Sequence, residues 1–168
     1  MTYPASAIAN YFVQRGLQDR SPVDPMKLQK LIYFAHGWNL AIYNEPLIDE
    51  MIEAWPYGPV TRSIYHAVKS HGSGPIEFPI FDQSADGPSL SSVSDDDTKE
   101  LLERVWRVYG EIASVELSKM SHDPEGPWHS AWHERALSGR IKGVDILNEE
   151  IRDYFIKVAD QQPASDGP

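Results

Sequence analysis

The densest run of large apolar and aromatic side chains in this chain extends from Met26 to Val60. Asp24 and Pro25 stand directly before it and make a favourable helix start, with an acidic N-cap followed by proline at the first helical position. We therefore predict a helix over Met26–Tyr43. Apolar residues recur along it at helical spacing: Leu28, Leu31, Ile32, Ala35 and Ile42.

This predicted helix is apolar around most of its circumference. Four more large side chains fall outside the main apolar stripe, namely Tyr33, Phe34, Trp38 and Leu40. A helix of this kind is usually buried, with other elements packed around it. A buried aromatic ring removes about 150–250 Å² from water, which is worth roughly 4–6 kcal/mol before opposing terms. We therefore expect Met26–Tyr43 to be the central helix of the core.

Shorter patterns predict the other helices. An amphipathic helix is expected over residues 3–14, with Ile8, Tyr11 and Phe12 facing inward and Gly16 ending it. A second begins at Gly58-Pro59 and stops near Gly72. Asp97 and Glu100 form an acidic capping box for the next one. Further helices are expected over residues 112–120 and 128–137, and a last one has Leu147, Ile151, Tyr154, Phe155 and Val158 on one face.

Three short segments are candidate strands: Leu47-Ile48, Met51–Trp55 and Ile76–Phe81. Pro79 would confine the third to a sheet edge, where it could pair with the second. Residues 83–94 are expected to form a loop.

The predicted fold is a single α+β domain over residues 1–160, predominantly helical. About six helices surround the central one beside a two- or three-stranded sheet, and residues 161–168 form a polar, disordered tail.

Composition excludes several classes of function. The chain of 168 residues has no cysteine, so disulfides, thiolate metal sites and a cysteine nucleophile are excluded. No signal peptide or membrane-length apolar run is visible, and we expect a cytoplasmic protein. The formal net charge of −10 argues against nucleic acid as the partner, since phosphate contacts need clustered lysine and arginine. The same charge permits electrostatic steering toward a basic protein.

Several segments resemble one known family. They are KLQKLIYFAHGWNLA (Lys27–Ala41), EAWPYGPV (Glu53–Val60), LSKMSHDPEGPW (Leu117–Trp128) and a C-terminal amphipathic helix containing DYF (Asp153–Phe155). Together they resemble the Panacea domain of SocA-type antitoxins, over roughly residues 5–158. The resemblance implies an antitoxin of a bacterial or phage toxin–antitoxin pair, which binds its cognate toxin protein. It also implies that some such proteins present the toxin to an energy-dependent protease.

On this resemblance we expect a non-enzymatic protein without cofactor. Its partner would be a toxin encoded by the adjacent gene. The residues favour the segment Trp55-Pro56-Tyr57-Gly58-Pro59 as a contact, because proline and glycine stiffen a turn and tyrosine is common at binding hot spots. The alternative is that Tyr57 packs on the central helix and the prolines only shape the turn. The residues leave both interpretations open.

Two further groups are candidate contacts. Lys30, Tyr33 and His36 lie on the less apolar side of the central helix and would line a groove if that side were uncovered. His122, Glu125 and Trp128 form a polar and aromatic turn within the family-like segment. They could grip a partner, but we favour a structural role, in which the histidine satisfies backbone groups and Trp128 fills the core.

The competing hypothesis is a hydrolase or metal-dependent enzyme that uses His122, His129 and His133. The last two are four residues apart and would share a helix face. Their spacing matches a zinc motif, but Ser130 stands where the general-base glutamate belongs. A third ligand would have to come from Glu125, His122 or a distant residue. We therefore predict no metal site.

Overall fold

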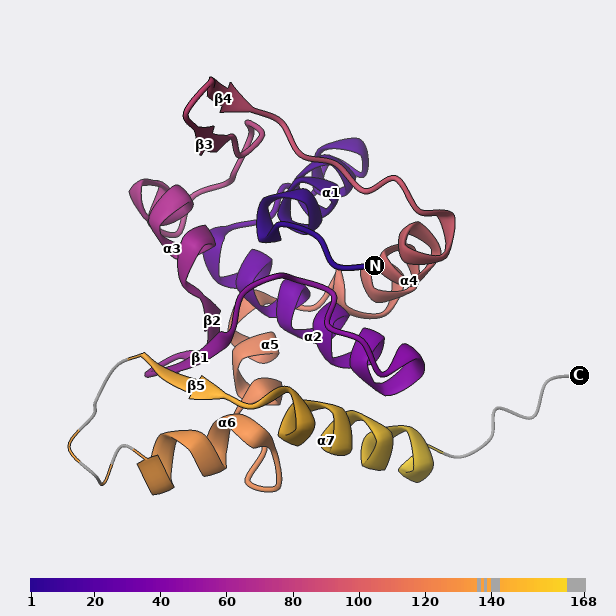
Figure 1. Ribbon diagram of the computed structural model, residues 1–168, viewed down its shortest axis with the longest axis vertical. Coiled ribbons are helices and arrows are strands. Elements are labelled where there is room, and N and C mark those ends of the chain that lie inside the picture. The colour runs from indigo at the N-terminus through magenta and orange to yellow at the C-terminus, as the bar shows by residue number, and fades with distance from the viewer. Residues whose placement is uncertain (136, 138, 140–142, 163–168) are drawn as a thin grey trace, which may run out of the picture.

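Helix α2 (Pro25–Tyr43) runs through the middle of the molecule (Figure 1). The computed structural model describes residues 1–135, 137, 139 and 143–162. The Asp24 carboxylate accepts a hydrogen bond from the Lys27 amide at 2.8 Å, and Asn44 ends the helix in a left-handed conformation. Most side chains of α2 are buried, because five helices and the main sheet pack around it. The predicted central helix is confirmed.

Six other α-helices lie within the described part of the chain. They are α1 (Ala5–Gln18), α3 (Arg62–Val68), α4 (Asp96–Tyr109), α5 (Ser114–Ser121), α6 (Pro127–Ser130) and α7 (Asn148–Gln161). A 3-10 turn, η1 (Lys69–His71), follows α3, and a π-helical turn, η2 (Ala131–Arg135), follows α6. None of the described helices is both long and apolar enough to span a bilayer.

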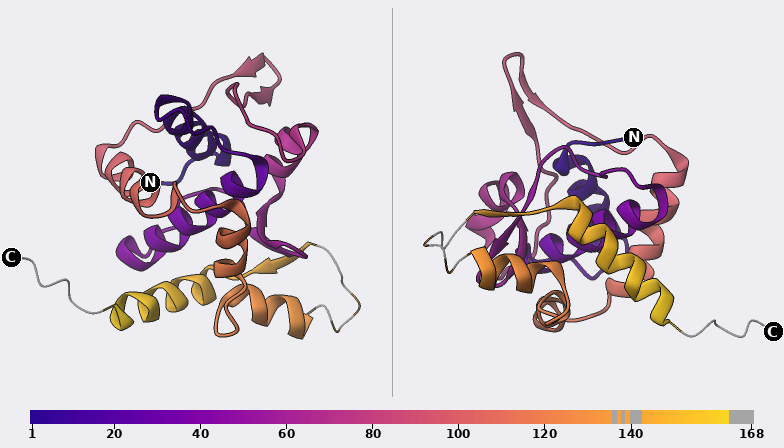
Figure 2. Two further views of the ribbon diagram at one scale, coloured as in Figure 1. Left: turned by 180° about the vertical axis from the view of Figure 1, so that it is seen from behind. Right: turned by 60° about the horizontal axis from the view of Figure 1, so that its bottom comes forward.

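The strands form two small antiparallel sheets. The main sheet has the order β2 (Gly58–Thr61), β1 (Ile52–Trp55), β5 (Val144–Ile146). Within it Glu53 lies opposite both Val60 and Asp145. A separate hairpin, β3 (Asp82–Ser84) and β4 (Gly87–Ser89), projects from the body (Figures 1 and 2). The predicted class, a predominantly helical α+β domain with a small sheet, is confirmed.

Aromatic side chains join α2 to its neighbours. The ring of Phe34 stacks on that of Tyr109 with centroids 4.3 Å apart, and Phe155 of α7 lies edge-on to Tyr33 and Trp38. The Phe155 ring occupies the space beside Gly37, where a Cβ atom would come within 2.2 Å of it. Only glycine therefore allows α7 to lie this close to α2.

The strand assignments are partly wrong. Ile76–Phe81 is not a strand, and the third strand of the sheet is β5. Gly58-Pro59 begins β2 rather than a helix, and α3 starts only at Arg62. The sequence pattern could not reveal either result, because the bonds that hold these segments come from distant side chains. Leu47-Ile48 forms one isolated bridge, between Ile48 and Tyr3.

Several predicted boundaries also differ. Gly16 lies inside α1, which continues to Gln18, and the N-cap of α4 is Asp95 rather than Asp97. The expected loop 83–94 contains most of the β3–β4 hairpin. Ile42 is 56% exposed rather than inward-facing, because it lies near the free end of α2. Leu147 caps α7 and is also exposed. Of the tail predicted over residues 161–168, only Gln161 and Gln162 are described. In the helix expected over residues 128–137, residue 136 lies outside the described residues.

Candidate functional site

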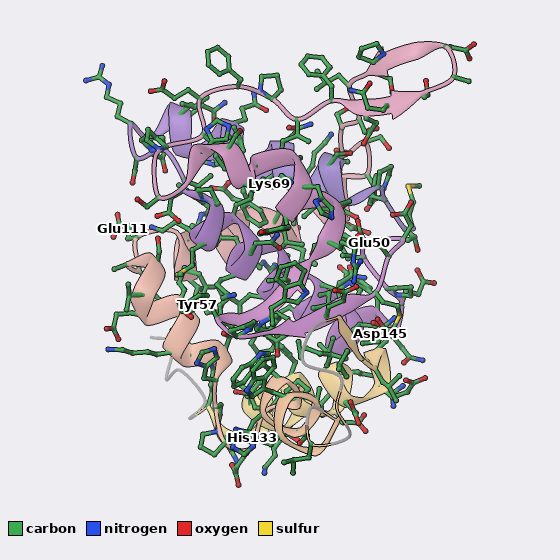
Figure 3. The ribbon with its side chains drawn as sticks, turned by 90° about the vertical axis from the view of Figure 1, so that its left-hand side faces the viewer. Glu50, Tyr57, Lys69, Glu111, His133 and Asp145 are labelled. Carbon is green, nitrogen blue, oxygen red and sulfur yellow. The ribbon has the colours of Figure 1, made fainter. Side chains whose placement is uncertain are left out.

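The segment Trp55–Pro59, called here the hairpin tip, connects β1 to β2. Trp55 pairs with Gly58, so that Pro56 and Tyr57 form the turn. Figure 3 labels Tyr57 at the end of this hairpin, and its side chain is 71% exposed. The tyrosine therefore does not pack on α2, which settles the conformational question that the residues left open.

Three helices hold the backbone of the hairpin tip. The indole N–H of Trp128 donates to the Trp55 carbonyl at 2.8 Å. The Ser118 hydroxyl donates to the Tyr57 carbonyl at 2.8 Å, and the Lys30 ammonium donates to the Pro59 carbonyl at 3.1 Å. These donors belong to α6, α5 and α2. Every second carbonyl of the tip is thus bound from below, while the Tyr57 ring above remains free of the core.

Gly58 allows this close approach. Its φ of +113° lies in the region that favours glycine. A Cβ atom there would lie 2.6 Å from the Ser121 hydroxyl and 2.9 Å from the Lys30 ammonium nitrogen. Both the backbone conformation and the space therefore require glycine.

The outer edge of β2 is bound to α2 as well. The Gln29 side chain accepts from the Thr61 amide at 2.8 Å and donates to the Thr61 carbonyl at 3.0 Å. Pro59 has no amide hydrogen, and Lys30 occupies its carbonyl. Gln29 and Lys30 are both buried, so these contacts are shielded from water.

Two weak bases lie beneath the hairpin tip. Lys30 is 1% exposed, and burial lowers the pKa of its ammonium to about 7. Burial and the neighbouring Lys30 charge lower the pKa of His122, while the Tyr57 carbonyl opposes that shift. The His122 ring stacks on Trp128 with centroids 4.0 Å apart, and its Nε2 is buried without a hydrogen-bond partner. Burial thus disfavours positive charge beneath the tip.

The outer face of the hairpin is aromatic. The Trp55 ring lies against Tyr65 of α3, with centroids 4.6 Å apart. Its indole N–H donates to Glu53, which also pairs with Arg62 at 2.9 Å. Trp55, Tyr57 and Tyr65 therefore offer apolar surface with polar edges, which is the composition of many protein-binding sites. Such a surface can bind another protein by direct contact.

The expected groove on α2 is not formed, because Lys30, Tyr33 and His36 are all buried. Burial raises the pKa of Tyr33 and lowers that of His36. The His36 Nε2 lies 2.9 Å from the Asn148 side-chain oxygen, and its Nδ1 faces the Ile48 amide. Tyr33 and His36 thus join α2 to its neighbours, while Lys30 binds the backbone of the hairpin tip.

The second candidate group is divided between core and surface. Trp128 is buried, and His122 is partly buried against it. Glu125 is exposed and pairs with Lys157 at 3.4 Å. Trp128 therefore supports the hairpin tip from inside and offers no exposed ring to a partner.

The histidine pair of the enzyme hypothesis does come together. The rings of His129 and His133 lie 4.3 Å apart. Among the described residues, however, no group of three or more His, Cys, Asp or Glu is arranged to hold a metal ion. A third ligand for this pair is therefore not found in that part of the chain.

Sequence reasoning missed the residues that support the hairpin tip: Gln29, Ser118, Ser121 and Tyr65. Each is distant in sequence from the residue it contacts, or is one of many similar polar residues on a helix. The family-like segments KLQKLIYFAHGWNLA and LSKMSHDPEGPW contain Gln29, Ser118 and Ser121, and they were the available signals for these three residues.

Comparisons with known proteins show which family the chain resembles. The family described as "Antitoxin SocA-like, Panacea domain" matches residues 28–129, which include α2, the hairpin tip and most of its supports. Antitoxin SocA of Caulobacter vibrioides (strain NA1000 / CB15N) is 33% identical over 154 residues, which cover 90% of this chain and 81% of that protein. No solved structure matches the chain significantly.

Proposed function

Because the chain belongs to the family of SocA-like antitoxins with a Panacea domain, we propose that it neutralises a cognate toxin in the cytoplasm by binding it directly. The toxin would be encoded by the adjacent gene. Neutralisation would need no catalysis, since it is sufficient that the bound antitoxin covers the toxin's active or binding surface. We place part of the contact at the hairpin tip.

One observation carries that placement: Tyr57 is exposed although its backbone is held from three helices. A side chain on a rigid support loses little conformational entropy when a partner covers it. Tyrosine also buries a large ring while its hydroxyl keeps a hydrogen bond, which explains its frequency at binding hot spots.

The test is co-expression of the adjacent gene with wild type and with Tyr57→Ala. Truncation of a hot-spot residue often costs at least about 2 kcal/mol, which is a roughly thirty-fold loss of affinity. We expect Tyr57→Ala to lose growth rescue and to bind the purified toxin about thirty-fold more weakly, while its thermal melt is unchanged. Tyr43→Ala is the matched control, because Tyr43 is an exposed tyrosine at the end of α2.

Two results would count against this proposal in different ways. If folded Tyr57→Ala binds the toxin as tightly as wild type does, the contact lies elsewhere on the surface. If wild type neither rescues growth nor binds the product of the adjacent gene, the antitoxin function with that partner is wrong.

The antitoxin could also present the bound toxin to an energy-dependent protease, which would add degradation to neutralisation. This requires that the toxin's half-life in the cell shortens when the antitoxin is present. A pulse-chase measurement with and without the antitoxin distinguishes the two forms. An unchanged half-life together with full rescue would restrict the function to binding.

A further inference from the structure

A second exposed feature lies apart from the hairpin tip. The segment Pro75–Val93, called here the arm, crosses the surface beside α1 and carries the projecting β3–β4 hairpin (Figures 1 and 2). In Figure 3 this hairpin extends at the top, far from the Tyr57 label. Residues 76–81 of the arm alternate as in a strand and residues 83–94 have the composition of a loop, and the arm lies outside the contact proposed at Tyr57.

The base of the arm is firmly held. The Asn10 side chain accepts from the Ile80 amide at 2.7 Å and donates to the Ile80 carbonyl at 2.9 Å. The Ile76 amide donates to the Val23 carbonyl at 2.8 Å, and the side chains of Ile76 and Ile80 are buried. Ile76 and Ile80 therefore fix the positions of the residues between and beside them.

Those residues include large apolar side chains that face solvent. Phe78 is 71% exposed, Leu90 is 57% exposed and Phe81 is 50% exposed. Anchors on both sides of Phe78 prevent it from turning into the core, since Ile76 and Ile80 already occupy the inward positions. Neighbouring exposed apolar residues on a well-held segment commonly mark an interaction surface.

The charged side chains of the arm itself are all acidic. No lysine or arginine occurs between Lys69 and Lys99. The carboxylates in that interval are Glu77, Asp82, Asp86, Asp95, Asp96 and Asp97. Within the arm, Glu77, Asp82 and Asp86 lie among the exposed aromatic rings, which favours a partner with basic and apolar side chains. Arg15 and Lys99 line the neighbouring hollow, but they are paired with Glu103 and Asp96.

A hollow flanks the arm on each side. One of about 610 Å³ lies between the arm and α3 and is lined in part by Phe78, Phe81 and Asp82. The other, of about 690 Å³, lies between the arm and α1 and includes Leu90 and Val93. Both have room for side chains of a partner segment laid across the arm.

We propose that the arm is a second docking surface, and that it receives a segment of the toxin in which lysine or arginine stands beside apolar residues. This rests on the proposed antitoxin function and names the chemistry of the partner. Charge disfavours the other occupants: nucleic acid and anionic lipid are repelled by the carboxylates, and a second copy of this chain carries the same charge of −10. Phe78 and Phe81 supply apolar contact, and Glu77 and Asp86 pair with the toxin's cations.

The experiment measures the affinity of the purified product of the adjacent gene for four variants of the full chain. Phe78→Ser combined with Phe81→Ser removes the aromatic contact, and Glu77→Lys combined with Asp86→Lys reverses the charge. Val108→Ser and Glu111→Lys are matched controls, because both residues are exposed and lie outside the arm. Each variant is also melted, so that loss of folding is separated from loss of binding.

We expect the aromatic variant to bind about thirty-fold more weakly at any salt concentration, as loss of a hot spot does. The charge variant should bind at least about ten-fold more weakly at low salt and approach wild type at high salt, because salt screens exposed charges. Both controls should bind as wild type does. The residues substituted in all four variants are exposed, so we expect the melting temperature of each variant to equal that of wild type.

The outcomes separate the two proposals. If wild type binds and Tyr57→Ala does not, while both arm variants bind normally, the arm proposal is overturned and the antitoxin function stands. If the aromatic variant loses affinity but the charge variant does not, the basic partner is wrong. If wild type itself neither binds nor rescues, the proposed function fails, and the arm proposal with it.

Discussion

The indole nitrogen of Trp128 lies 2.8 Å from the carbonyl oxygen of Trp55, so that a buried residue of α6 supports the exposed hairpin tip. The two residues are 73 positions apart in sequence. Trp128 also stacks on His122 and on Trp132, with centroids 4.0 Å and 5.7 Å apart. The position of Tyr57 at the surface therefore depends on packing well below it.

Trp128→Phe is expected to loosen the hairpin tip without removing a surface residue. The change deletes the N–H donor and part of the ring, which should destabilise the protein by about 1–3 kcal/mol. Urea denaturation measures that loss, and hydrogen exchange at the Gly58 amide reports local opening. Trp132→Phe, which keeps the bond to Trp55, should leave Gly58 protected. Equal exchange at Gly58 in wild type and Trp128→Phe would contradict the support described here.

Lys30 predicts a specific pH dependence of stability. Its pKa falls from 10.5 in the unfolded chain to about 7 in the folded protein, because the ammonium is buried. Between these values the unfolded chain binds more protons, so the free energy of unfolding should rise with pH, by up to about 1.4 kcal/mol per unit. Lys30→Met removes the titrating amine, and its stability curve between pH 7 and 9 should be flatter. Parallel curves for the two proteins would show that Lys30 keeps its ordinary pKa.

Gly37→Ala is expected to separate α7 from α2. Alanine improves helix propensity by roughly 1 kcal/mol, but the added methyl would overlap the Phe155 ring. Overpacking of this kind should outweigh the gain and leave a net loss of about 2 kcal/mol. Phe155→Leu makes room, so the double variant should lose less than the sum of the single losses. Strict additivity in a denaturation experiment would show that the two residues do not share that space.

Trp38→Ala tests the aromatic packing of α2. The Trp38 ring packs edge-on against Phe155, and its indole N–H donates to the Tyr109 hydroxyl at 3.0 Å. Trp38 is only partly buried, so its truncation should cost less than the about 3–5 kcal/mol lost with a fully buried aromatic ring, and should lower the melting temperature clearly. Trp38→Phe should lose only the hydrogen bond and a smaller area, and so stay folded. A Trp38→Ala variant that melts within a degree or two of wild type would mean that this ring contributes little.

Local signals predicted the parts of the fold that local contacts stabilise. The Asp24-Pro25 start of α2 depends on one bond to Lys27, three residues away, and the sequence shows it directly. The strand β2 depends instead on Gln29, about thirty residues distant, and its proline and glycine resemble a helix start. Ile76–Phe81 alternates like a strand, yet Asn10 occupies the backbone groups of Ile80 that a neighbouring strand would need.

The candidate site divides in the same way. Proline and glycine around Tyr57 indicated a stiff turn, but only tertiary packing decides whether the tyrosine faces α2 or water. Lys30 and His36 were expected to line a groove if their side of α2 stayed uncovered, but residues 58–61 and 148 lie against them. Periodicity gives the direction of a side chain, and it carries no information about what lies opposite.

The contacts of Gln29 and Lys30 with β2 have a consequence for assembly. Edge strands invite pairing with other chains, because they present unused amide and carbonyl groups. On the outer edge of β2 the Thr61 groups are taken by Gln29, the Pro59 carbonyl by Lys30, and proline offers no amide. A foreign strand therefore cannot extend the sheet on this side. The protein can present an exposed hairpin to its surroundings without turning it into a template for β-aggregation.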